Sequence, residues 1–78
     1  MGACLDNVPV GQTIRVRAVS LSSEEREWLG AVGIVAGEVL TVLRRAAFGG
    51  PMHVRTEDGG EFAIAQSLAA AIETESAG

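Results

Sequence analysis

The segment 31–38, Ala-Val-Gly-Ile-Val-Ala-Gly-Glu, constrains the fold of this chain more than any other feature. Gly33 is suited to end a helix, because glycine adopts the left-handed backbone conformation without a Cβ penalty. Gly37 predicts a tight turn, and a run of strand-forming residues begins directly after it. A short helix and a strand therefore meet at this point.

Capping signals define both ends of that helix. Ser22 offers a side-chain oxygen to the first turn, and Glu25 follows three residues later, which is the spacing of a capping box. Gly30 weakens the helix by up to about 1 kcal/mol relative to alanine. The pattern predicts a helix of about three turns that ends at Gly33.

The helix presents two large apolar side chains in sequence, Trp28 and Leu29. Consecutive helical residues point about 100° apart, so these two cannot both face one core. Leu29 shares its face with Val32. One of the pair Trp28 and Leu29 is therefore expected to be partly exposed.

The rest of the chain is typical of short strands. Residues 13–21 alternate between apolar and polar positions, which is the period of a half-buried strand. Further strands are expected at 39–43, 52–56, 61–65 and 72–74, with a helical turn at 66–71 and a frayed tail at 75–78. The pattern predicts a mainly β, partly open barrel of about five strands with one inserted short helix. The expected core consists of Ile14, Val16, Val39, Leu43, Phe62 and Ile64.

Composition restricts the class of protein. The chain has 78 residues and one cysteine, which predicts a single domain without an intramolecular disulfide. The net charge of −4 disfavours nucleic-acid binding, because that binding depends on neutralising phosphates. No window approaches the roughly 20 apolar residues of a membrane span. We expect a cytoplasmic protein with no direct insertion into a membrane.

The sequence contains few residues in patterns typical of catalysis or of metal binding. No nucleophile lies in a catalytic motif, and no phosphate-binding loop is present, so we expect no enzyme and no cofactor. His53 has no cysteine or histidine at ligand spacing. Weak Fe²⁺ or Zn²⁺ binding by His53 with Glu57 or Asp58 has no motif to support it.

Several segments in order resemble the FeoA family, the small proteins of bacterial ferrous iron transport. The matching residues span 5–74, almost the whole chain, and are Leu5, Pro9, Gly11, Arg26, Leu29, Gly33, Ile34, Gly37, the loop 48–51, Ile64, Ala65, Leu68, Ala69 and Ile72. Relatives often have proline where this chain has Ala36, and leucine where it has Val32. The resemblance implies an SH3-like barrel, with residues 1–78 forming a single FeoA-like domain.

The resemblance also implies a protein partner, FeoB, a membrane iron transporter with a cytoplasmic GTPase domain. The contact residues expected on this basis are Trp28, Leu29, Val32, Gly33, Ile34 and Phe48. Each side chain also has a structural interpretation: Leu29 can anchor the helix, Trp28 can close the core, and Phe48 can cap the barrel. Self-association remains open.

A second function is a metal-responsive module, like the SH3-like domain at the C-terminus of iron-dependent repressors. The length of the chain argues against it, because no DNA-binding helical domain precedes the barrel. An arginine finger from Arg26, Arg44 or Arg45 toward a partner GTPase is conceivable, but no spacing selects one of the three.

Overall fold

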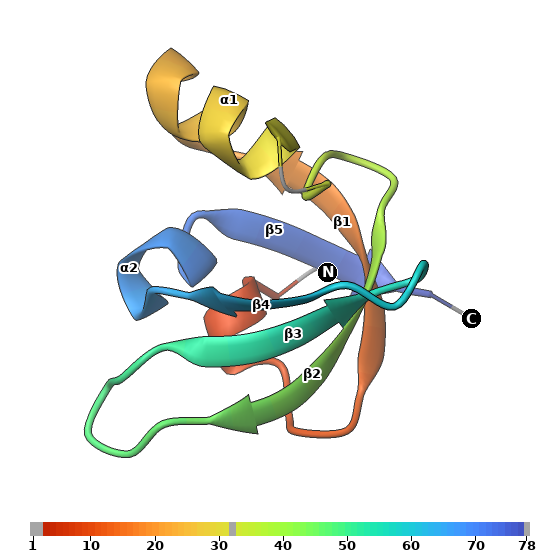
Figure 1. Cartoon of the computed structure of the whole chain (residues 1–78), viewed down its shortest axis with the longest axis vertical. Coiled ribbons are helices and arrows are strands. Elements are labelled where there is room, and N and C mark those ends of the chain that lie inside the picture. The colour runs from red at the N-terminus through yellow and green to blue at the C-terminus, as the bar shows by residue number, and fades with distance from the viewer. Residues whose placement is uncertain (1–2, 32, 78) are drawn as a thin grey trace.

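The computed structural model describes residues 3–31 and 33–77, and the elements follow the expected order (Figure 1). Only Val32 is left out of the interior of the chain, so the expectations for its helical face and its partner contact lie outside the described residues. The elements are η1 (Leu5–Asn7), β1 (Thr13–Val19), α1 (Ser23–Ala31), β2 (Val39–Arg45), β3 (Met52–Thr56), β4 (Glu61–Ile64), α2 (Gln66–Ala69) and β5 (Ile72–Ser76).

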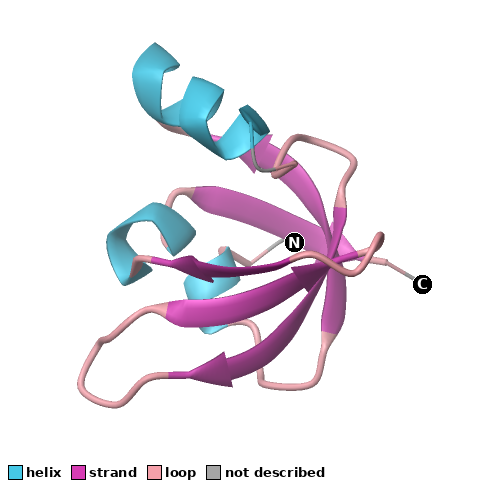
Figure 2. Cartoon of the chain, in the orientation of Figure 1, coloured by secondary structure: helices cyan, strands magenta, loops and turns pink. Residues whose placement is uncertain are grey.

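One antiparallel sheet curls into a partly open barrel (Figure 2). Its strand order is β4-β3-β2-β1-β5, so β4 and β5 form the two edges and α2 connects them. Register shifts interrupt β1 between Val16 and Ala18 and β2 between Val42 and Arg44. Such bulges bend a strand and increase its twist, which helps a small sheet to close. The prediction of a five-stranded barrel with one inserted helix is confirmed.

The C-terminal strand is longer than the sequence indicated. Glu75 and Ser76 were expected in a frayed tail, but they pair with Arg15 and Ile14 of β1. The sequence did not indicate this part of the strand, because its side chains are polar and exposed and show no alternation of apolar and polar residues.

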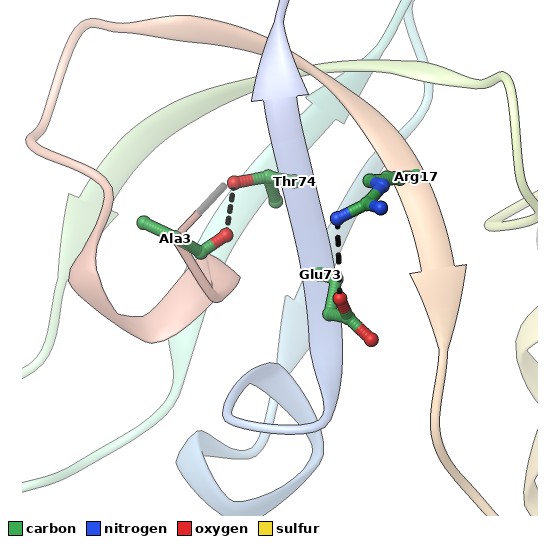
Figure 3. Close-up of polar contacts among 4 residues, drawn as sticks. All are labelled: Ala3, Arg17, Glu73 and Thr74. Carbon is green, nitrogen blue, oxygen red and sulfur yellow. Dashed lines mark hydrogen bonds and ion pairs between the residues drawn. The ribbon is translucent and has the colours of Figure 1, made fainter. Parts of the chain in front are cut away.

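The N-terminal segment covers the outer edge of β5. The amide of Thr74 donates to the carbonyl of Ala3 at 2.8 Å, and Cys4 forms a β-bridge with Glu73. On the opposite edge of β5, toward β1, the exposed guanidinium of Arg17 lies 3.7 Å from the carboxylate of Glu73 (Figure 3). Cys4 is therefore tied to the sheet.

The core forms inside the curled sheet, and the prediction for it is correct in part. Ile14, Val16 and Ile64 are buried, whereas Phe62 is half-buried. The prediction for β2 chose the wrong face: Leu40 and Val42 are fully buried, while Val39 and Leu43 are half-buried. Apolar residues occupy both faces of β2, and its bulge falls at Leu43, so alternation alone cannot identify the inner face.

The β3–β4 turn holds a carboxylate whose pKa is lowered. The hydroxyl of Thr56 donates to Asp58, and the amide of Gly60 donates to the same oxygen at 3.4 Å. These bonds favour the charged carboxylate, the Thr56 bond most, and lower the pKa of Asp58 from its ordinary value of 3.8.

A carboxylate with a lowered pKa stabilises the folded protein above its ordinary pKa, and the effect is lost as pH falls through the folded pKa. We therefore expect the parent to lose more stability below pH 3.8 than the variant Asp58→Asn does. Thermal unfolding of both proteins from neutral to acid pH measures this. Parallel acid profiles would show that the turn does not stabilise the charged carboxylate.

Candidate partner-binding surface

Helix α1 begins with the capping box that the sequence predicted. The Ser22 hydroxyl accepts from the amide of Glu25 at 3.3 Å. In return, the Glu25 carboxylate accepts from the hydroxyl of Ser22 at 3.0 Å and from its amide at 3.4 Å. Reciprocal bonds of this kind satisfy amides that have no partner within the helix and fix where the helix starts.

The end of α1 is a Schellman motif built on Gly33. This glycine has φ +93°, and its amide donates to the carbonyl of Gly30 at 3.0 Å. The amide of Ile34 donates to the carbonyl of Leu29 at 2.8 Å. The side chains of Leu29 and Ile34 are each only 1% exposed, as expected of the apolar contact that accompanies this motif. The prediction that the helix stops at Gly33 is confirmed.

The turn that follows is fastened to β1. Glu38 donates its amide to the carbonyl of Val35 at 3.0 Å, with Gly37 between them at φ +96°. The amide of Gly37 donates to the carbonyl of Val16 at 2.7 Å, and Arg15 Nη1 donates to the carbonyl of Gly37 at 3.0 Å. The helix and its turn therefore form one platform held against the barrel.

Two apolar side chains of this platform face outward. Trp28 is 53% exposed and Val35 is 48% exposed. The expectation that only one of Trp28 and Leu29 is buried is confirmed, and it is Leu29 that packs in the core. Leu29 and Ile34 are almost fully buried, so both anchor the helix and its turn, and their expected contact with a partner stays a prediction.

A hollow of about 240 Å³ lies beside the outer end of this platform. It is lined by Val19, Arg26, Ile34, Val35 and Ala36. Arg26 is the charged member of the lining, and its guanidinium makes no hydrogen bond or ion pair within the described chain. An apolar hollow beside a free cation can receive an apolar side chain of a partner protein that carries a carboxylate next to it. Val35 was not among the contact residues expected from the sequence, because the segment that contains it was predicted only to form a turn.

The loop between β2 and β3 carries the second predicted contact residue. Phe48 is fully exposed, which excludes the interpretation that it caps the barrel. Its φ of +58° and the +75° of Gly49, together with the 3.2 Å bond from the amide of Gly50 to the carbonyl of Ala47, define a type I′ turn. The structure does not join Phe48 to the α1 platform, because the two lie on different elements at opposite sides of the barrel (Figure 1).

A left-handed backbone is unfavourable for phenylalanine, whereas asparagine tolerates it. Because the ring of Phe48 has no packing to lose, Phe48→Asn is expected to raise the free energy of unfolding by about 1 kcal/mol. Denaturant unfolding measures this, with Phe48→Ala as the control that keeps the strain. Equal midpoints for the asparagine variant and the parent would mean that position 48 carries no strain.

Arg45 has a structural role that the sequence could not reveal. Its guanidinium donates to the backbone carbonyls of Asp6 and Val8, which lie 39 and 37 positions away in the chain. It thereby ties the end of β2 to the N-terminal segment. No local pattern signals a contact over such a separation.

The candidate metal ligands are not brought together. Arg44 Nη2 lies 3.4 Å from His53 Nδ1, so a cation is the polar neighbour of this ring. Glu57 lies beyond the end of β3, in the β3–β4 turn. Over residues 3–31 and 33–77, no group of three or more His, Cys, Asp or Glu side chains could hold a metal ion. In the same residues, no helix is long and apolar enough to cross a bilayer.

Comparisons with known proteins agree on one family. The model of the FeoA domain matches residues 3–76. A crystal structure of Iron Uptake Regulatory Protein (FeoA) superimposes with a TM-score of 0.83 at 24% identity, and the match covers 96% of each chain. The FeoA-like protein from Clostridium acetobutylicum gives a TM-score of 0.83 at 25% identity over 97% of this chain and 87% of that one. Comparison with curated proteins finds no match.

The same fold occurs as part of larger regulators. A manganese-dependent transcriptional repressor in complex with manganese superimposes with a TM-score of 0.89 at 25% identity. The match covers 96% of this chain but only 36% of the repressor. The SH3-like barrel is therefore shared between the FeoA family and a domain of metal-dependent repressors.

Proposed function

Since this chain belongs to the FeoA domain family, we propose that it is an accessory protein of bacterial ferrous iron uptake that works in the cytoplasm. In this proposal it binds a FeoB-like membrane transporter through protein–protein contact and regulates the transporter's GTPase domain. The iron ion is the cargo of the transporter and is not held by this chain.

The exposed side of the α1 platform is the observation that carries the proposal. Trp28 is half exposed on a short helix whose two ends are both fixed by hydrogen bonds. Tryptophan and arginine are enriched among residues that dominate binding energy, and a rigid backbone lowers the entropic cost of binding. The hollow beside Val35 and Arg26 supplies an adjacent concave site.

The small number of residues suited to metal binding or catalysis also supports a role through protein–protein contact. Within the described parts of the chain no metal-binding group is formed, and the sequence contains no lysine and no phosphate-binding loop. Any hydrolysis of nucleotide would then take place on the partner. This chain would act by preferring one conformational state of that partner, because a ligand shifts an equilibrium only through differential affinity.

Calorimetric titration of the chain with the cytoplasmic part of the transporter tests the proposal. The titration is run without nucleotide, with GDP, and with a non-hydrolysable GTP analogue. Affinity that changes with the nucleotide is the expected result for a regulator. Absence of binding by a folded sample in all three states would overturn the proposal.

The likeness to the manganese-dependent repressor favours a second candidate, a metal-responsive module. Titration with Fe²⁺ and Zn²⁺ distinguishes the two candidates. Tight stoichiometric binding that disappears in His53→Ala would support the metal module, because His53 is the single histidine of the chain. Docking to the transporter without metal binding would exclude it.

A further inference from the structure

The tip of the β2–β3 hairpin has an unusual composition for an exposed loop. Residues 46–51 read Ala-Ala-Phe-Gly-Gly-Pro and contain no polar side chain. Five of the six are exposed, Gly50 is half-buried, and Phe48 stands fully in solvent. Exposed apolar surface of this kind marks contact with a protein or a membrane.

Two arginines, Arg44 and Arg45, end β2 directly before this apolar tip. Residues 39–56 contain Arg44, Arg45, His53 and Arg55 but no aspartate or glutamate. The rest of the chain carries three arginines and all ten carboxylates. In the fold Arg55 stands opposite Glu61 of β4, so the unbalanced positive charge of the hairpin lies at its tip, at Arg44 and Arg45. Positive charge at an exposed tip favours contact with anionic surfaces.

The hairpin is held in a defined shape and points away from the acidic helix. In Figure 1 the loop lies at the lower left, on the side of the barrel remote from α1. A Cβ on Gly49 would lie 2.8 Å from the side-chain oxygen of Gln66, and one on Gly50 would lie 2.6 Å from the Cβ of Ala46. These close approaches and the type I′ turn fix the loop.

We propose that this hairpin is a peripheral membrane-binding element for anionic phospholipid bilayers. Phe48 would enter the boundary between headgroups and acyl chains, while the exposed Arg44 contacts lipid phosphates. Arg45 is not one of these lipid contacts, because its guanidinium donates to the carbonyls of Asp6 and Val8 and holds the end of β2 against the N-terminal segment. Among the residues that the structure describes, His53 is the polar neighbour of Arg44, so the Arg44 side chain is free to turn toward a phosphate.

The side-chain composition of the tip favours a bilayer over a protein or a nucleic acid as its binding surface. A protein interface ordinarily includes polar groups that form about one hydrogen bond per 100–200 Å². The six loop residues offer no side chain for such bonds, and their single aromatic ring gives no series of stacking platforms for bases. A bilayer requires only an apolar insertion with a basic surround. The inference uses observations separate from those that support the proposed function.

Each of the two signals is weak alone. Burial of one phenylalanine ring should change membrane partitioning by about tenfold, and each arginine near an anionic surface by about fivefold. Binding is therefore expected to be reversible and dependent on ionic strength.

Vesicle binding by the full chain tests the proposal. One set of vesicles contains phosphatidylcholine alone, and the other contains equal amounts of phosphatidylcholine and phosphatidylglycerol. We expect binding to the anionic set only, reduced about tenfold in Phe48→Ser and about fivefold in Arg44→Gln. The matched controls Trp28→Ser and Arg17→Gln, which alter an exposed aromatic and an exposed cation elsewhere, should bind as the parent does.

A fluorescence readout shows where the tip goes. In the double variant Trp28→Phe, Phe48→Trp the single indole sits at position 48, and its emission should shift to the blue on anionic vesicles. The emission of Trp28 in the parent should not shift. No binding to anionic vesicles, or binding that Phe48→Ser leaves unchanged, would overturn the proposal. Binding of the tip to an acidic protein without binding to vesicles would overturn it too. None of these assays contains the transporter, so their failure is distinguishable from failure of the proposed function.

Discussion

Gly33→Val is expected to lower the free energy of unfolding by about 2 kcal/mol. Gly33 has φ +93°, and no atom lies within 4 Å of the position that a Cβ would occupy. The cost is therefore backbone strain and not a steric clash. A β-branched residue resists this conformation most, and relieving the strain would break the two hydrogen bonds that end α1.

Thermal unfolding measures the effect of Gly33→Val. For a domain of this size, about 2 kcal/mol corresponds to a fall in Tm of roughly 10 °C. Gly33→Asn is the matched control, because asparagine tolerates the left-handed region and should lose much less. A valine variant that melts with the parent would show that the helix does not end as described.

Leu29→Gln should have the larger effect, a loss of about 3 kcal/mol or more. Leu29 is 1% exposed and lies in the core beneath α1, so glutamine would leave a cavity and bury an amide without a partner. A chain of 78 residues has a total stability on the order of 4–12 kcal/mol. This one substitution would therefore remove much of the stability of the protein.

The two roles considered for Leu29 make different predictions. If Leu29 is an anchor, Leu29→Gln lowers the free energy of unfolding. Leu29→Met preserves the side-chain volume, so it should lower the free energy of unfolding by less than about 1.5 kcal/mol and keep partner binding. Denaturant unfolding and transporter binding are measured on the same samples. A glutamine variant with the stability of the parent but no transporter binding would restore Leu29 as a direct contact.

Local signals carried most of the successful prediction. The capping box of Ser22 and Glu25 and the terminal Gly33 each act within a few residues, so they can be identified without knowledge of the tertiary structure. The five-stranded barrel then follows from the number of short strands and the turns between them.

Features that depend on distant contacts were not predictable. Apolar residues occupy both faces of β2, so only the folded sheet shows that Leu40 and Val42 lie on its inner face. The strand at Glu75 and Ser76 exists because β1 offers a free edge. Arg45 acts on the N-terminal segment, which only the folded chain brings near it.

The candidate partner-binding surface was likewise predictable only in its local features. Helical geometry predicted that Trp28 and Leu29 could not share a core, but not which of them is exposed. Phe48 was equally compatible with a barrel cap and a free tip, and its position at the apex of a type I′ turn decides for the tip. The sequence indicated Phe48 as a contact residue of a protein partner, but only the folded hairpin shows that its ring is fully exposed at a tip next to Arg44 and Arg45.

The central claim is that this chain binds a FeoB-like transporter through the exposed side of α1 and its turn. The affinity of Trp28→Ser for the cytoplasmic part of the transporter, relative to the parent, tests that claim most directly. Trp28 is 53% exposed, so its replacement should leave the stability within about 0.5 kcal/mol of the parent. We predict an affinity at least about tenfold weaker. Equal affinities of the folded variant and the parent would contradict the claim.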